Sequence, residues 1–182
     1  MVKPPSMSAS SYVVLGLLDR HGPTTPYQLE RIISASIGYF WGFPRSQLYA
    51  EATRLARHGL IGEHREDAGR RRRTLSLTDQ GRDELNRWLA VSTDQPTEIR
   101  DEGLIRLFFT RDNTTAEDVR RLAVEQENAH RMRLADYESL VQRGVLPANS
   151  PQRATLEFGL KFERLAATFW AELAEHLGQG TV

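Results

Sequence analysis

The sequence of 182 residues contains no cysteine, and its only lysines are Lys3 and Lys161. The lack of thiols excludes disulfides, thiolate metal sites, iron–sulfur clusters and a cysteine nucleophile, and it fits a reducing cytosol. Long hydrophobic runs are also missing. The longest, Tyr12–Leu18, is far too short to cross a bilayer, and it has neither a basic leader nor a small-residue cleavage site. We therefore expect a cytoplasmic protein without a membrane span or a signal peptide.

Sequence motifs of the common enzyme classes are missing as well. The chain has no phosphate-binding glycine loop, no nucleophile elbow and no dinucleotide-binding fingerprint. No two histidines lie four residues apart, and no carboxylate cluster completes a metal site with any of His21, His58, His64, His130 and His176. We therefore expect no metal, no cofactor and no enzymatic activity.

The charge is balanced over the whole chain but divided between its halves. Residues 1–90 carry 13 basic and 9 acidic side chains, a net of +4, whereas residues 91–182 carry 11 basic and 15 acidic side chains, a net of −4. Arginine supplies 22 of the 24 basic residues. Arginine suits contacts with phosphate and base edges, although a GC-rich genome produces the same bias. The division predicts an anionic partner for the first half only.

Helix signals begin the first half after a polar arm over residues 1–9. Ser10 or Ser11 can cap a first helix over residues 12–20. Thr25 and Pro26 fit the cap and the first position of a second helix. These signals predict two short helices before the aromatic segment that follows them.

A third helix and a hairpin come next. Apolar side chains recur at helical spacing over residues 45–58, and Gly59 fits the C-terminal cap. Residues 60–65 and 73–77 read as strands around a turn with consecutive arginines, which predicts a hairpin with a basic tip. Thr78 then caps a helix to about residue 91, whose expected inward side chains are Leu85, Trp88 and Leu89. This order of elements is typical of a winged helix-turn-helix.

The second half is predicted to be entirely helical. A short apolar helix lies near residues 99–109, and a capping box formed by Thr114 and Glu117 opens a long helix that Gly144 closes. Ser150 caps the last helix. The predicted fold is mainly α, with a winged-helix domain over residues 1–92 (1–9 a flexible arm) and a helical dimerisation and effector domain over residues 93–182.

The first half contains three specific motifs. They are Ser46-Gln47-Leu48-Tyr49, continued through Leu55 to Gly59-Leu60-Ile61, then Pro26-Tyr27-Gln28-Leu29, and Leu77-Thr78-Asp79-Gln80-Gly81. In that order they resemble the recognition helix, the second helix and the end of the wing in the PadR family of transcriptional regulators. The wing lacks the family's usual tyrosine pair, so Leu75 is expected to fill that gap. The resemblance covers about residues 11–90 specifically and continues more loosely into the tail.

The resemblance and the basic hairpin together predict contact with double-stranded DNA. The exposed side of the third helix would read bases and bind phosphate, with Gln47 suited to adenine and Arg45 or Arg54 to guanine or phosphate. The hairpin arginines would bind phosphate or enter the minor groove, whereas Arg73 shares a face with Leu75 and Leu77 and is expected to be structural. The alternative is a solvated polar surface. The predicted DNA-binding residues are Arg45, Ser46, Gln47, Tyr49, Thr53, Arg54, Arg57, Arg70, Arg71 and Arg72.

The last helix carries two apolar faces, which is more than one chain needs to pack it. A second copy of the helix would cover the extra face and form a homodimer. The alternative is a three-helix bundle that buries everything internally. The predicted dimerisation residues are Val119, Leu122, Gln126, Tyr137, Phe158, Phe162, Phe169 and Trp170. His130 is expected in the same seam as a satisfied polar residue.

Aromatic residues near the third helix allow two interpretations. They line a pocket for a small-molecule effector, or they belong to the core or dock the tail. The pocket interpretation names Phe40, Trp41, Trp88 and Trp170. The family resemblance implies that effectors are aromatic or drug-like molecules.

The combined prediction is a dimeric, DNA-binding transcriptional regulator that acts as a repressor on a palindromic operator and is released by an effector. The alternative is a winged-helix module for protein interaction, without sequence-specific DNA binding. Replacing Arg70, Arg71 and Arg72 with alanine would distinguish the two hypotheses. A regulator would lose affinity for DNA, whereas an interaction module would keep its affinity for its protein partner. The sequence leaves open whether translation begins at Met1 or Met7.

Overall fold

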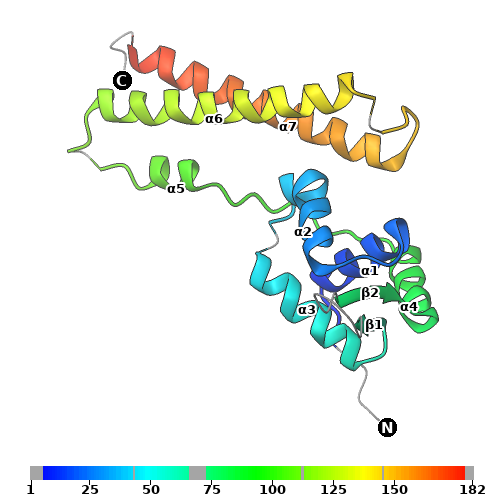
Figure 1. Ribbon diagram of the computed structural model, residues 1–182. Coiled ribbons are helices and arrows are strands. Elements are labelled where there is room, and N and C mark those ends of the chain that lie inside the picture. The colour runs from blue at the N-terminus through cyan, green and yellow to red at the C-terminus, as the bar shows by residue number, and fades with distance from the viewer. Residues whose placement is uncertain (1–5, 43, 66–72, 112, 145, 179–182) are drawn as a thin grey trace. The chain divides into compact units, whose positions relative to one another are not determined.

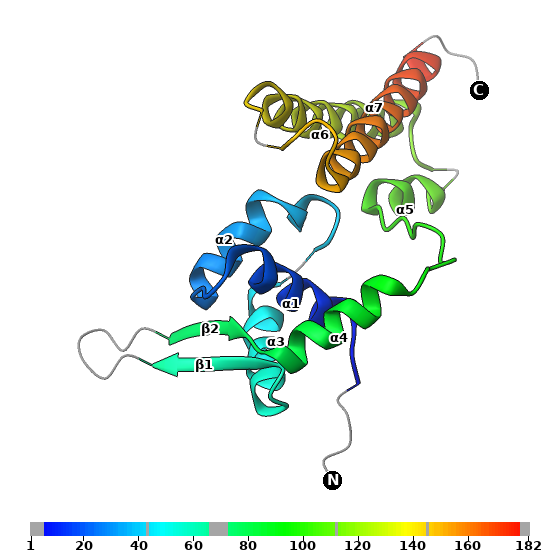
Figure 2. The same ribbon diagram turned by 90° about the vertical axis from the view of Figure 1, so that its right-hand side faces the viewer.

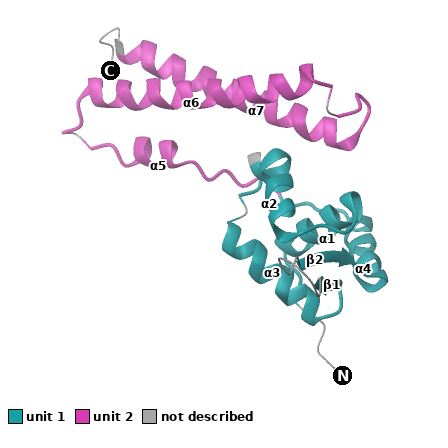
Figure 3. Cartoon of the chain, in the orientation of Figure 1, with its two compact units in different colours: residues 1–95 teal, residues 96–182 magenta. Residues whose placement is uncertain are grey.

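The computed structural model describes residues 6–42, 44–65, 73–111, 113–144 and 146–178. The chain divides into two compact units, Met1–Gln95 and Pro96–Val182 (Figure 3). We call them unit 1 and unit 2. None of the helices in the described part of the chain is long and apolar enough to cross a membrane.

Unit 1 is a winged helix-turn-helix, as predicted. Its helices gather at one end of a two-stranded sheet, and the strands extend away from them (Figures 1 and 2). In chain order the elements are α1 (Ala9–His21), α2 (Pro26–Ala35), the short 3-10 helix η1 (Ile37–Tyr39), α3 (Arg45–Arg57), β1 (Ile61–Arg65), β2 (Arg73–Leu77) and α4 (Asp79–Ala90).

The start of α1 differs from the prediction. Ser8 caps it in a reciprocal box with Ser11, so the helix begins at Ala9. Ser10 and Ser11 were expected as caps but lie within the first turn, where both are buried. The Thr25 cap of α2, with Pro26 at the first position, is confirmed.

The hairpin pairs β1 with β2 in antiparallel register, with Ile61 opposite Leu77 and Glu63 opposite Leu75. Thr24, in the loop after α1, adds an isolated bridge to Leu75, and the two residues exchange backbone hydrogen bonds of 2.8 and 2.9 Å. Leu75 is fully buried, which confirms that it fills the place expected for it. The wing is therefore anchored to the helices at its base.

The junction between β2 and α4 explains the Leu-Thr-x-x-Gly motif. The Thr78 hydroxyl donates to the carbonyls of Gly59 and Leu60, at 2.7 and 2.9 Å, and accepts from the Gly81 N–H at 3.1 Å. A Cβ on Gly81 would lie 2.0 Å from the Leu60 carbonyl oxygen. Only glycine fits there, because the helix backbone touches the strand backbone.

The core of unit 1 is one cluster of buried aliphatic side chains from every helix and both strands. Its members are Val14, Leu15, Leu17, Leu18, Leu29, Ile33, Leu48, Ala52, Leu55, Leu60, Ile61, Leu75 and Leu85. The prediction that Trp88 and Leu89 point inward is wrong, since both are exposed. Trp88 instead stacks on Tyr12, with ring centroids 4.5 Å apart. The buried side of α4 is therefore narrower than its apolar residues predicted, with Gly81 and Leu85 buried.

Unit 2 contains α5 (Glu102–Phe108), α6 (Ala116–Gln142) and α7 (Pro151–Gly178). The long helices α6 and α7 lie side by side as a hairpin (Figures 1 and 2). Thr115 and Asp118 form the capping box of α6, one residue after the predicted pair Thr114 and Glu117. Ser150 caps α7 as expected, through its hydroxyl and the Arg153 N–H at 3.1 Å.

The apolar centre of unit 2 is small. Ala123, Trp170 and Ala174 are buried together, with Leu107, Leu122, Val124 and Leu173 packed against them. Tyr137 is also buried, and a Cβ on Gly159 would lie 2.8 Å from its ring. The prediction that Trp170 and Tyr137 lie in a dimer seam is therefore wrong, because unit 2 buries both within itself.

Candidate nucleic-acid interface

The exposed side of α3 carries small, polar and basic side chains. Leu48, Ala52 and Leu55 are buried on its inner side. Ser46, Ala50 and Arg57 are exposed, and Thr53 is half-buried between them. We call these four residues the α3 outer face. A helix with a flat, polar and basic face can lie against an anionic groove without a steric barrier.

The N-terminus of α3 is open to an anion. Its N-cap residue is Pro44, whose side chain accepts no hydrogen bond, so the first-turn N–H groups have no side-chain cap. Arg45 is exposed there, 3.0 Å from the Glu30 carboxylate and above the Tyr49 ring at 5.9 Å. The hydrogen bond with Tyr49 and the charge of Glu30 raise the pKa of Arg45 above its ordinary value.

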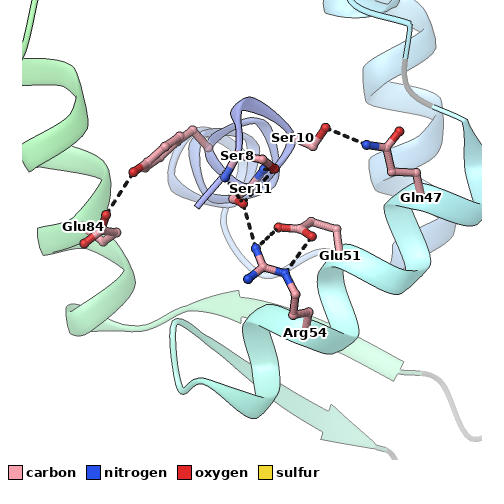
Figure 4. A network of polar contacts seen from close by, with 8 residues as sticks. Ser8, Ser10, Ser11, Gln47, Glu51, Arg54 and Glu84 are labelled. Atoms are coloured by element: carbon pink, nitrogen blue, oxygen red, sulfur yellow. Dashed lines mark hydrogen bonds and ion pairs between the residues drawn. The ribbon is translucent and has the colours of Figure 1, made fainter. Parts of the chain in front are cut away.

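Gln47 and Arg54 were predicted to read bases, but both make contacts with α1 (Figure 4). The Gln47 amide donates to the Ser10 hydroxyl at 2.9 Å. Arg54 donates to the Ser11 hydroxyl at 2.9 Å and to both carboxylate oxygens of Glu51, at 3.0 and 2.5 Å. These contacts give Arg54 a role inside the fold. The helical periodicity of α3 showed that these positions are polar but not that a polar partner faces them.

The Glu51 carboxyl is held in its charged form. Burial raises its pKa, but the hydrogen bonds from Arg54 and Ser11 and the charge of Arg54 lower it by more, so the net pKa lies below the ordinary value. The pKa of Arg54 is raised, chiefly by its hydrogen bond with Glu51. The pair is therefore ionised at neutral pH.

The wing is tied to α3 through Arg73, which was predicted to be structural. Its guanidinium lies 2.8 Å from the Glu63 carboxylate on β1 and donates to the Thr53 hydroxyl on α3 at 3.3 Å. Arg73 thereby joins both strands to the α3 outer face. The predicted phosphate-binding residues Arg70, Arg71 and Arg72 lie outside the described residues.

The four aromatic residues assigned to an effector pocket have separate environments. Phe40 and Trp41 are exposed in unit 1, Trp88 is stacked on Tyr12, and Trp170 is buried in the core of unit 2. The Trp170 side chain therefore packs in the core of unit 2 instead of lining an effector pocket. The alternative interpretation, that these aromatic residues belong to the core, is wrong for Phe40 and Trp41.

A cavity of about 550 Å³ that the sequence did not indicate lies between α5 and α6 in unit 2. Its lining is mainly polar and includes Arg100, Asp101, Gln126, His130 and Arg133. Gly103 brings the two helices close, since a Cβ there would lie 2.7 Å from the Gln126 side chain.

Beside this cavity, His130 forms a buried contact with Glu163. The ring Nδ1 lies 2.6 Å from a Glu163 carboxylate oxygen, and Nε2 lies 3.8 Å from Asp101. His130 was expected in a dimer seam, yet its partners are within unit 2. The contact joins α6 to α7 and faces the residue that caps α5.

The second apolar face of α7 is exposed, as the sequence suggested. Phe158, Leu165 and Phe169 are exposed and Phe162 is half-buried, at spacings that place all four on one side. On α6, the predicted residues Val119, Leu122 and Gln126 are half-buried. We call Phe158, Phe162, Leu165 and Phe169 the α7 outer face.

Comparison with known proteins accounts for both units. Residues 14–87 match the transcriptional regulator PadR-like family, and residues 99–177 match the C-terminal region of virulence activator alpha. The first half of the chain is therefore similar to the PadR-like family of transcriptional regulators. This is a family of regulators and not of enzymes.

Bacillus subtilis provides a relative of this chain. Its negative transcriptional regulator PadR is 25% identical over 155 residues, which are 84% of this chain and 84% of that protein. The crystal structure of that PadR in complex with operator DNA has a TM-score of 0.78 at 23% identity and covers 93% of this chain and 99% of its own. The structure of PadR in complex with p-coumaric acid has a TM-score of 0.72 at 22% identity, covering 92% and 98%.

Proposed function

We propose that this PadR-like protein binds double-stranded DNA through the α3 outer face and the wing. The observation that carries the proposal is the outer face itself: Ser46, Ala50, Thr53 and Arg57 form a small, polar and basic surface on the third helix of a winged helix-turn-helix. The face would enter the major groove, and the uncapped N-terminus of α3 with Arg45 would bind phosphate. Tyr49, Arg70, Arg71 and Arg72 complete the proposed set.

Two copies of the chain would act together. On the α7 outer face Phe158, Leu165 and Phe169 are exposed and Phe162 is half-buried, and a second copy related by a two-fold axis would bury them. The winged-helix domain of residues 1–92 would then bind DNA, and the helical domain of residues 93–182 would set the distance between two recognition helices about 34 Å apart. A palindromic operator follows from that symmetry.

The direction of regulation is proposed from the relative. Bacillus subtilis PadR is a negative regulator, and it forms complexes with operator DNA and with p-coumaric acid. We propose that this protein is a cytoplasmic repressor, released from its operator by an aromatic small molecule. Linkage then requires that operator DNA weaken the binding of that molecule by the same factor.

Fluorescence anisotropy with DNA fragments from the region upstream of the protein's own gene tests the proposal. The wild-type protein should prefer one fragment over a scrambled competitor by about a thousandfold, with an affinity that falls steeply with salt. Ala50→Glu should abolish this binding, because the exposed site accepts the side chain but places a carboxylate against phosphate. Equal, weak binding to both fragments would contradict the proposal.

The protein-interaction module remains the second candidate. The same titration separates the two through the Arg70→Ala/Arg71→Ala/Arg72→Ala variant. A loss of DNA affinity supports the regulator, whereas unchanged association with a partner protein and no wild-type preference among DNA fragments would support the module.

A further inference from the structure

The contact between α1 and α3 is unusual because one end of it is polar. Gln47, Glu51 and Arg54 fall at positions i, i+4 and i+7 of α3, so they share one side of that helix. Opposite them on α1 lie Ser10 and Ser11, which are 6% and 0% exposed. Further along the same two helices, Val14, Leu15, Leu48 and Leu55 are fully or nearly fully buried in the common aliphatic core.

Hydrogen bonds join Ser8, Ser11, Arg54 and Glu51 at this polar end, and a separate bond joins Ser10 to Gln47 (Figure 4). The Ser8 N–H donates to the Ser11 hydroxyl at 2.9 Å, the Arg54 guanidinium donates to the same hydroxyl at 2.9 Å, and Arg54 grips Glu51 through two nitrogens. On the other side of α1, the Tyr12 hydroxyl donates to Glu84 of α4 at 3.0 Å. The first turn of α1 thus bonds to both α3 and α4.

A directional network does something that aliphatic packing does not. Apolar contacts are non-directional, so a helix held by them alone can rotate or slide slightly at little cost. The N–H groups of the planar Arg54 guanidinium point in fixed directions. Its hydrogen bonds to the Glu51 carboxylate and the Ser11 hydroxyl therefore favour one arrangement of the three side chains. The Arg54 and Glu51 side chains are partly buried, 30% and 12% exposed. An ion pair removed from water contributes little net stability compared with apolar residues, and its best-attested role is to fix one register.

We propose that the Ser11–Arg54–Glu51 network is a positioning device that fixes the rotation of α3 about its own axis, and thereby determines which α3 side chains reach the DNA bases. The inference rests on the proposed DNA-binding function. Arg54 and Glu51 act through Ser46, Ala50 and Arg57, which the network orients, and do not themselves contact DNA.

The test uses a double variant, Glu51→Leu/Arg54→Met, in the full-length protein. Removing both partners keeps the net charge and leaves no unpaired charge in the interior. An operator is first selected from random DNA by the wild-type protein. Anisotropy then gives the affinity of each variant for that operator and for a scrambled duplex. We expect the ratio of the two affinities to fall at least about tenfold, while affinity for the scrambled duplex and its salt slope stay within about twofold, because phosphate contacts carry no sequence information.

A structural role alone would give a different result. It would lower the thermal midpoint and leave the affinity ratio of the folded protein unchanged, and that result would overturn the inference. The control Asp19→Asn/Arg82→Gln removes another ion pair of α1, the one with α4, and should leave the ratio unchanged. If the double variant fails to fold, Ser11→Ala removes a single hydroxyl from the network and must still lower the ratio.

Failure of the proposed function has its own signature. A wild-type protein that selects no sequence from random DNA contradicts sequence-specific binding itself. A wild-type protein that selects a sequence, together with a double variant that selects the same sequence with the same preference, contradicts only the positioning inference.

Discussion

The two units bury their apolar side chains to very different degrees. Unit 1 encloses 13 aliphatic residues in one cluster, whereas the cluster of unit 2 contains three buried residues. In unit 2, Phe108 is 80% exposed, Phe109 70% and Leu165 69%. Helices packed on a sheet enclose a buried core. Two long helices packed side by side bury only the side chains along the line where they touch.

The difference teaches where each unit obtains its stability. Unit 1 buries the inner side of α3 in its own aliphatic core. Unit 2 keeps large apolar side chains at the surface, where contiguous patches mark an interaction site. The chain thus combines a unit that has a large core of its own with a unit whose exposed apolar side chains are available for the association proposed above.

The largest expected effect is the loss of dimerisation when a charge is placed on the α7 outer face. Leu165→Glu would place an unpaired carboxylate in the proposed interface, at a cost of about 3 kcal/mol or more, which raises the dimer dissociation constant at least about a hundredfold. Analytical ultracentrifugation should show monomers at concentrations where the wild-type protein is dimeric.

The matched control is Thr168→Glu, which adds the same charge at an exposed position of α7 about a quarter turn away from the outer face. It should leave the dimer intact. Dimers of unchanged strength for Leu165→Glu would show that this face is covered by something other than a second copy.

Removing the buried contact of unit 2 should have the next largest effect. His130→Ala takes the ring from a Glu163 carboxylate that is 2% exposed and leaves it in the interior without that donor. We expect a loss of about 3 kcal/mol in the free energy of unfolding, measured by urea denaturation followed by circular dichroism. His130→Asn, whose amide can still donate, should recover part of the loss. Equal losses for both variants would mean that the bond contributes nothing.

A smaller effect should follow from a single methyl group in unit 1. Gly81→Ala would place its Cβ 2.0 Å from the Leu60 carbonyl oxygen, so the base of the wing must shift, at about 2 kcal/mol. Gly16→Ala in α1 meets nothing within 4 Å and should stabilise the helix by about 0.5–1 kcal/mol. Differential scanning calorimetry should therefore show opposite shifts. Shifts of the same sign would contradict the close approach at Gly81.

Much of the fold could be predicted because local patterns determine it. The period of Leu48, Ala52 and Leu55 defined α3, and Thr25, Thr78 and Ser150 marked helix starts through cap chemistry. The caps of α1 and α6 were misplaced because several serines or threonines stand in a row. Only tertiary packing decides which of them lies outside the first turn.

The site was less predictable because it depends on what faces each side chain. Periodicity predicted which positions of α3 are polar. It did not predict that Gln47 and Arg54 donate hydrogen bonds to serines of α1. In unit 2, Trp170 was assigned to a partner because its helix has apolar residues on two sides, and only the path of α6 shows which side the chain covers itself. The α7 outer face is what remains uncovered.

The smallest expected effect is a difference between the two units in how much their stability depends on a single carboxylate at acid pH. The pKa of Glu51 is lowered in folded unit 1, so its carboxylate adds stability above the ordinary pKa of 4.5, and that contribution disappears as pH falls through the folded value. Glu51→Gln should therefore flatten the decrease in the urea midpoint of unit 1 below about pH 4.5. In unit 2, hydrogen bonds from Thr115 and Arg121 lower the pKa of Asp118, but its side chain is 42% exposed and screened by solvent. Asp118→Asn should accordingly change the acid limb less than Glu51→Gln. A larger change for Asp118→Asn would contradict a stabilising role for the partly buried Glu51 carboxylate.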